Sequence, residues 1–177
     1  MKKSLGGIQG ETTKKSRYFI TNCMDDFWCF FTDTSLAADK TQVPSAPTEG
    51  TPSKNSNFGS MEESIEIQST QYIKSWNTNI NNLSVNIVNV SGFTDSYSTV
   101  ETISVDLYLQ YWDSGQGKWV DLVHVGEFKQ SNTSHVAGTD DVAVSSGFYY
   151  RTRGIHYIIE NGTVEETSSV STYIYLK

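Results

Sequence analysis

Residues 103–112 read Ile-Ser-Val-Asp-Leu-Tyr-Leu-Gln-Tyr-Trp, the most regular alternation of side chains in the chain. Apolar or aromatic residues stand at every second position from Ile103 to Tyr111, and the positions between run from Ser104 to Trp112. A β-strand places such alternate residues on opposite faces, whereas the period of a helix cannot. The β-branched and aromatic residue types also favour a strand. These ten residues therefore predict a strand that is buried on one face.

Similar segments lie on both sides of this strand, separated by turn residues. The further strands expected are 65–73, 83–87, 118–125, 142–144, 148–159 and 163–176. Val88 and Val90 indicate a bulge or a change of face after the second of these. Residues 114–117 form a Gly-containing turn, and Asn161-Gly162 is the dipeptide typical of a type I′ hairpin turn. The sequence thus predicts an all-β, antiparallel β-sandwich of about seven strands with almost no helix.

The segment from Ser146 to Arg153, followed by Asn161-Gly162, resembles the F–G hairpin of fibronectin type III and related immunoglobulin-like sandwiches. The resemblance implies that Tyr149 or Tyr150 is a corner tyrosine whose hydroxyl bonds back to the preceding backbone. It also implies that the arginines after it face water. On these grounds the expected fold is an immunoglobulin-like, fibronectin type III-like sandwich.

A second resemblance rests on Leu109-Gln110, Gly117-Lys118-Trp119 and the run from Gly147 to Arg151. This pattern is similar to a group of small secreted proteins of Gram-positive bacteria that are classed as a domain of unknown function. It covers about residues 64–176. The resemblance implies export and a β-sandwich, and it brings no catalytic or binding residues.

Residues 1–37 have the order of a degenerate signal peptide. Early basic residues precede an apolar run, and Ser35-Leu36-Ala37 fits a cleavage site. Asn22, Asp25, Asp26 and Asp33 interrupt the apolar region, and charges there are costly. Three interpretations stay open: a poor but working signal, a frame or start-site error, and a cytosolic protein with an irregular tail. We expect a secreted or cell-surface protein, without excluding the cytoplasm.

Residues 38–63 contain all three prolines and few large apolar side chains. Such a segment buries too little apolar surface to offset its ordering entropy, so we expect a disordered linker there. The β-sandwich domain is then residues 64–177.

The charge of the chain argues against two classes of partner. Residues 38–177 hold eight basic and sixteen acidic side chains. An acidic domain repels phosphate backbones, so we expect no nucleic acid. No stretch approaches the length of apolar residues that a membrane span requires, so we expect no integral span. An unknown protein or glycan is the expected partner of a monomer.

Residues for catalysis or metal binding do not form a recognisable motif. His124, His135 and His156 have no ligand spacing, and Asp140-Asp141 lacks the repeat of a calcium loop. No nucleophile elbow and no phosphate loop occur. We therefore expect no enzyme activity, no cofactor and no metal.

One face of the strand at 103–112 is a candidate binding surface. Tyr108 and Trp112 share it, and Arg151 and Arg153 lie beside them if the two strands are neighbours. Exposed aromatic rings could stack on a sugar or a partner, whereas ordinary cross-strand packing would bury them. The leading hypothesis is a non-enzymatic interaction module. The alternatives are a carbohydrate-binding module and a small hydrolase with an unrecognised site.

Overall fold

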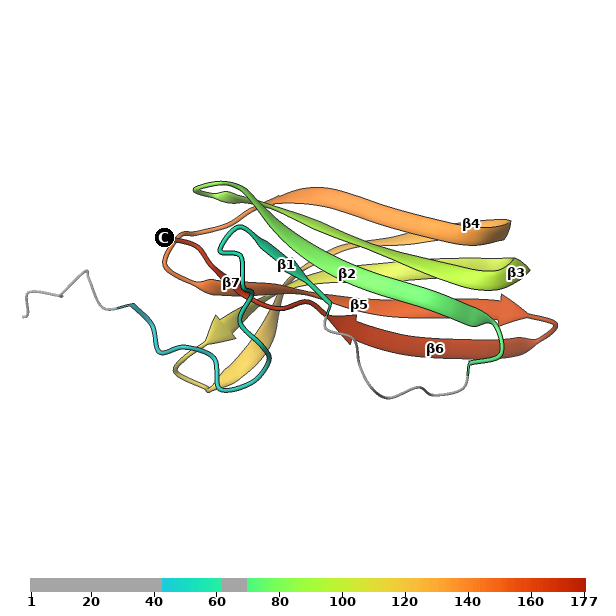
Figure 1. The fold of residues 1–177 in the computed structure, drawn as a ribbon, viewed down its shortest axis with the longest axis horizontal. Coiled ribbons are helices and arrows are strands. Elements are labelled where there is room, and N and C mark those ends of the chain that lie inside the picture. The colour runs from blue at the N-terminus through green and yellow to red at the C-terminus, as the bar shows by residue number, and fades with distance from the viewer. Residues whose placement is uncertain (1–42, 62–69) are drawn as a thin grey trace, which may run out of the picture. The chain divides into compact units, whose positions relative to one another are not determined.

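The computed structural model describes residues 43–61 and 70–177, and within them every regular element is a β-strand. The seven strands are β1 (Phe58–Ser60), β2 (Ile73–Ser84), β3 (Ile87–Asp113), β4 (Lys118–Ala143), β5 (Tyr149–Glu160), β6 (Thr163–Val170) and β7 (Ile174–Tyr175). All their pairings are antiparallel (Figure 1). The all-β, antiparallel prediction is confirmed. No helix in this part of the chain is long and apolar enough to cross a membrane.

One sheet contains all seven strands, in the order β1-β2-β3-β5-β6, with β4 added to β3 and β7 to β5. The first half of β3 lies between β2 and the second half of β4. Its second half lies between β5 and the first half of β4. Strand β3 therefore connects the part of the sheet that contains β2 to the part that contains β5, and β4 pairs with it in both parts.

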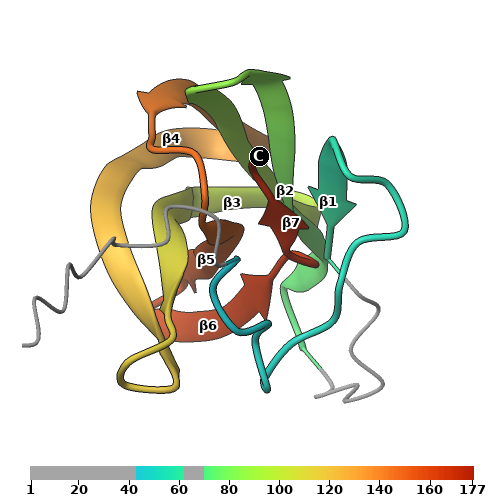
Figure 2. The same ribbon diagram turned by 90° about the vertical axis from the view of Figure 1, so that its left-hand side faces the viewer.

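A break in pairing lies in the middle of the β3–β4 hairpin. Asp95 pairs with His135, but the next pair is Val100 with Thr133, so β3 has three more residues than β4 in between. Such a bulge bends a strand and increases its twist. The two halves of β3 can then point their apolar sides into a common interior, and Figure 2 shows the strands curled around it.

The interior is filled by the alternating side chains of β2, β3 and β5. Its fully buried apolar members include Ile73, Ile80, Val88, Val90, Ile103, Val105, Leu107, Leu109 and Ile158. The hydroxyl of Thr152 on β5 donates to the carbonyl oxygen of Asn79 on β2 over 2.9 Å. At Gly154 an added Cβ would lie 2.5 Å from the Thr78 methyl group, so a glycine is needed for this close approach.

A polar cluster lies inside this core. The His156 side chain is fully buried, with Nδ1 2.8 Å from Thr94 Oγ1 and Nε2 2.7 Å from Ser169 Oγ. Burial lowers the pKa of His156 from 6.5 to about 4, against the raising effect of a hydrogen bond to the backbone of Phe93. The imidazole is therefore neutral at pH 7.

Several expectations need correction. The prediction of a sandwich is not confirmed: the described residues form one curled sheet, in which β3 and β4 are each long enough to pair at both of its ends. Leu83 to Ile87 is not one continuous strand: Leu83 lies at the end of β2, Val85 and Asn86 form the turn, and Ile87 begins β3. Val88 and Val90 point regularly into the core.

The expected linker is also wrong in part. Residues 58–60 form β1, which pairs with β2, and Met61 makes a bridge to Ser171. The first expected strand, 65–73, lies mostly outside the described residues, as do the signal-like segment 1–37 and the beginning of the linker.

The turn at Asn161-Gly162 is present between β5 and β6. Both residues have positive φ, 51° and 73°, which is the backbone that the primed hairpin turns require.

Candidate functional site

The structure brings three of the four predicted surface residues together on the outer face of β3, β4 and β5. Tyr108 on β3 pairs with Arg153 on β5, and Gln110 pairs with Arg151. The guanidinium carbon of Arg153 lies 4.1 Å from the centre of the Tyr108 ring. Tyr108 is therefore partly covered by an arginine.

Trp112, the fourth residue, is not available for binding. Its side chain is 3% exposed, and its ring packs edge-on against Trp119 at 5.5 Å between centres and 62° between planes. Trp119 is its cross-strand partner on β4, so ordinary cross-strand packing covers it. Of the two arrangements that the sequence left open for this face, the structure has cross-strand packing at Trp112, and the sequence did not show which ring would lie opposite it.

Arg153 belongs to a closed network of charges. Its Nη2 and Nε atoms donate to the Asp121 carboxylate over 2.8 and 3.3 Å, and Gln110 donates to the same group over 2.7 Å. Burial alone would raise the pKa of Asp121, but these hydrogen bonds outweigh it and hold the pKa below its usual value. The charges on this part of the face are thus matched within the chain.

Tyr108 continues this network toward β4. Its hydroxyl donates to Asp106 over 2.8 Å, and this hydrogen bond, with burial, raises the pKa of Tyr108. The His124 ring stacks on the Tyr108 ring at 4.8 Å and also contacts Asp106. These contacts hold the aromatic side chains in place and leave no gap between them for a ligand ring.

Arg151 differs from Arg153 in its partners. Its Nε donates to Gln110 Oε1 over 2.7 Å, and its guanidinium carbon lies 4.3 Å from the centre of the Trp119 ring. Burial lowers the pKa of Arg151 to about 10, against the raising effect of Glu49. Arg151 stacks on an aromatic ring rather than binding a carboxylate directly.

The three histidines do not gather. His124 contacts Asp106, His135 Nδ1 lies 2.6 Å from Asp95, and His156 is inside the core. Asp141 accepts a hydrogen bond from Asn89 over 2.7 Å, as part of ordinary β3–β4 pairing. Within residues 43–61 and 70–177, no three His, Cys, Asp or Glu side chains lie close enough to share a metal ion.

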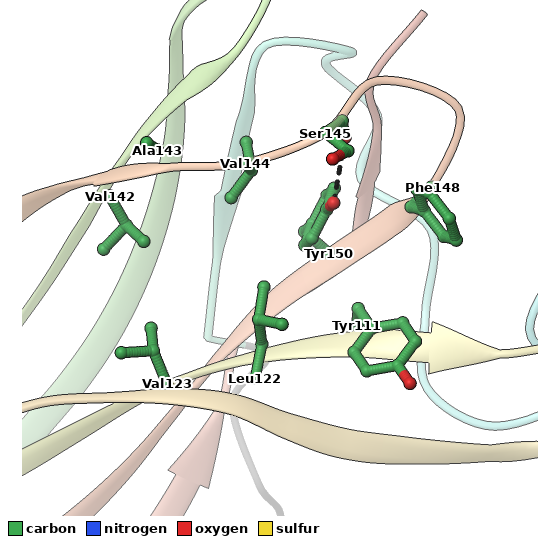
Figure 3. A pocket seen from close by; sticks show the side chains of 9 residues that line it. All are labelled: Tyr111, Leu122, Val123, Val142, Ala143, Val144, Ser145, Phe148 and Tyr150. Carbon is green, nitrogen blue, oxygen red and sulfur yellow. Dashed lines mark hydrogen bonds between the residues drawn. The ribbon is translucent and has the colours of Figure 1, made fainter.

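An apolar cleft that the sequence did not predict lies where the two halves of β4 approach each other. It has a volume of about 750 Å³ and is open on one side. It is lined by Tyr111, Leu122, Val123, Val142, Ala143, Val144, Ser145, Phe148 and Tyr150 (Figure 3). Leu122, Val123 and Phe148 are apolar side chains that remain exposed on its walls.

A β-bulge produces one wall of this cleft. Gln110 pairs with Asp121 and Leu109 with Val123, so Leu122 is an extra residue in β4. The opposite wall comes from residues 142–144 at the other end of the same strand. The only sequence signal was the adjacent apolar pair Leu122-Val123, which breaks the alternation of β4.

Tyr150 forms the floor of the cleft and connects it to the core. Its ring is buried, and its hydroxyl donates to the carbonyl oxygen of Ser145 over 2.9 Å (Figure 3). Tyr149, the other candidate for a corner tyrosine, instead contacts Tyr173 and Tyr175 on the outer face.

Tyr150→Phe is expected to lower the free energy of unfolding by about 1 kcal/mol, because it removes one hydrogen bond and keeps the ring. Tyr149→Phe is the matched control and is expected to change it less, since no hydrogen bond of its hydroxyl is found among residues 43–61 and 70–177. Urea unfolding of both variants checks this. Equal effects would show that the Ser145 contact does not stabilise the 145–148 loop.

No family model, no curated protein and no solved structure matches this chain.

Proposed function

We propose that this chain is a non-enzymatic interaction module and that the apolar cleft between the two halves of β4 is its ligand site. The observation that carries the proposal is the exposure of Leu122, Val123 and Phe148 around one concave, apolar volume. Exposed apolar groups gathered in a concavity are typical of ligand and partner sites. A volume of about 750 Å³ is within the usual range for such sites.

The lining indicates the class of ligand. Six of the nine lining residues have purely hydrocarbon side chains: Leu122, Val123, Val142, Ala143, Val144 and Phe148. The Tyr150 hydroxyl, the polar group at the floor, is already bonded to the Ser145 backbone. An apolar group, such as an alkyl chain or an apolar side chain of a partner, fits this lining best.

The cleft predicts that the full chain binds the fluorescent apolar dye 1-anilinonaphthalene-8-sulfonate and that Leu122→Gln weakens this binding about tenfold. The substitution places an amide on the wall, which loses roughly 1–2 kcal/mol of apolar contact. Dye titration followed by fluorescence gives the dissociation constants.

Val164→Gln is the matched control for this experiment. Val164 on β6 is 55% exposed, comparable with the 47% of Leu122, but it does not line the cleft. Its dye affinity is expected to equal that of the unchanged chain. Equal loss in both variants, or no dye binding at all, would remove the cleft as a ligand site.

The outer face of β3 and β5 is a weaker candidate. A sugar platform there needs two exposed rings, and Trp112 is buried while Tyr108 lies under Arg153. A small hydrolase would need several free polar groups in a cleft. No observation favours either alternative over the interaction module.

We also propose that the chain is exported and that its sheet is related to the immunoglobulin-like sandwiches. Support for export is the order of basic, apolar and small residues in 1–37. Support for the relation is the hydrogen bond from Tyr150 to a carbonyl five residues upstream, as in a tyrosine corner. N-terminal sequencing of protein from the culture medium tests export. A mature end at Ala38 supports it, and an intact Met1 in the cell pellet contradicts it.

A further inference from the structure

Residues 49–53, the strap, lie along the outer face beside Trp119, Arg151 and Tyr173, which we name the strap site. Trp119 Nε1 donates to the Glu49 carbonyl oxygen over 2.9 Å. The Tyr173 amide donates to Thr51 O, and the Ser53 amide donates to Tyr173 O, each over 2.9 Å. The strap is bent at Glu49 and Gly50, forms a bridge to Tyr173 at Pro52, and binds through backbone hydrogen bonds and an indole N–H.

The strap needs a glycine at its centre. Gly50 has φ of 82°, a left-handed backbone that favours glycine. A Cβ added there would lie 3.1 Å from Arg151 Nη1 and 3.8 Å from Tyr173 Cδ1. The side chain of Arg151 therefore packs directly against the glycine backbone.

An acidic residue precedes this glycine. The charge of Glu49 raises the pKa of Arg151. Among the described residues, Arg153 forms an ion pair and Arg151 does not. The strap site thus offers a cation on an aromatic ring, an indole donor and the backbone of Tyr173. Those groups match a segment that carries a carboxylate before a glycine.

We propose that the strap site binds an acidic peptide segment of a partner protein, bent at a glycine as the strap is, and that Glu49–Ser53 occupies it in cis. The partner segment would replace the strap, pair with the Tyr173 backbone, accept the Trp119 hydrogen bond and place its carboxylate near Arg151. This inference does not depend on the apolar cleft.

The strap can be displaced at a lower cost than unfolding the domain. Glu49, Gly50, Thr51 and Pro52 are exposed, so lifting them exposes little apolar surface of their own. Segments held mainly by a few surface hydrogen bonds open with free energies well below the global value. A partner segment therefore competes with a weakly held one.

The test uses the full chain with Gly50→Val and a labelled peptide of residues 47–53, Pro-Thr-Glu-Gly-Thr-Pro-Ser, added in trans. Valine is strained at a positive φ and its side chain would meet Arg151, so the strap should lift. We expect faster hydrogen exchange at the Tyr173 amide and at least tenfold tighter peptide binding than in the unchanged chain, measured by anisotropy.

Gly162→Val is the matched control, because Gly162 also has positive φ but has no atom within 4 Å of an added Cβ. It should leave peptide binding as in the unchanged chain. Adding Arg151→Gln to Gly50→Val should weaken peptide binding at least tenfold.

Two results would overturn the proposal. One is a Gly50→Val chain that does not bind the peptide more tightly than the unchanged chain does. The other is binding that is the same with Arg151→Gln. If Gly50→Val does not fold, Glu49→Lys replaces it, since that side chain is exposed. Tighter peptide binding by Glu49→Lys than by the unchanged chain supports the site, and equal binding refutes it.

Discussion

The free energy of unfolding is expected to fall by about 3 kcal/mol as the pH drops from 6.5 to 4, because of His156 alone. Its pKa is lowered from 6.5 to about 4 by burial. Between these values the unfolded chain binds the proton and the folded chain does not, so acid favours unfolding. The stability that depends on neutral His156 is complete above pH 6.5 and is lost as the pH falls to 4. The difference between a pKa of 6.5 in the unfolded chain and about 4 in the folded chain corresponds to a free energy of about 3 kcal/mol.

His156→Gln should remove this part of the pH dependence, since a neutral amide can contact Thr94 and Ser169 without titrating. His135→Gln is the control, because the His135 side chain is 58% exposed. Urea unfolding between pH 4 and 7 measures both, and His156→Gln is expected to give the flatter curve. A curve as steep as that of His135→Gln would contradict the assignment of the slope to His156.

Leu107→Ala should lower the free energy of unfolding by about 2–5 kcal/mol, the usual cost of emptying a core leucine site. Leu107 is fully buried in the second half of β3 and packs close to Gly92 in the first half. The cavity would therefore open at the contact between the two ends of the sheet. Thermal or urea unfolding measures the loss.

Leu83→Ala is the matched control for Leu107→Ala. Leu83 is 50% exposed near the β2–β3 turn, so its loss should cost less than about 0.5 kcal/mol. If Leu83→Ala lowered the free energy of unfolding as much as Leu107→Ala does, the inward face of β3 would be wrongly identified.

The alternation at residues 103–112 predicted its strand correctly, because every second residue from Ile103 to Leu109 is buried. Ile103, Val105, Leu107 and Leu109 point into the core as their spacing required. The opposite face could not be predicted, because its environment depends on neighbours. Trp112 lies opposite Trp119 and is buried by it.

The turn after β2 was missed because Val85-Asn86 is not a usual turn dipeptide and Val85 extends an apolar series. The strand at Phe58–Ser60 was missed because it is only three residues long and Gly59 at its centre has low strand propensity, so that its pairing with β2 forms it. In both places long-range contacts outweigh the local preference.

The cleft could not be predicted either, since its walls come from the two ends of one 26-residue strand. Their approach depends on the bend near Asp95–Val100 and on the bulge at Leu122. Neither feature has a glycine or proline signal at its centre. The pairing of Tyr108 with Arg153, by contrast, followed once β3 and β5 were assumed to be neighbours.

The claim that the apolar cleft is the ligand site is tested most directly by methyl NMR of the full chain titrated with 1-anilinonaphthalene-8-sulfonate. Binding in the cleft predicts saturable shifts of the methyl groups of Leu122, Val123, Val142 and Val144, which line it. The methyl groups of Val164 and Val170 on β6 should not shift, although they are exposed. Shifts confined to β6, or spread equally over all exposed methyl groups, would contradict the claim.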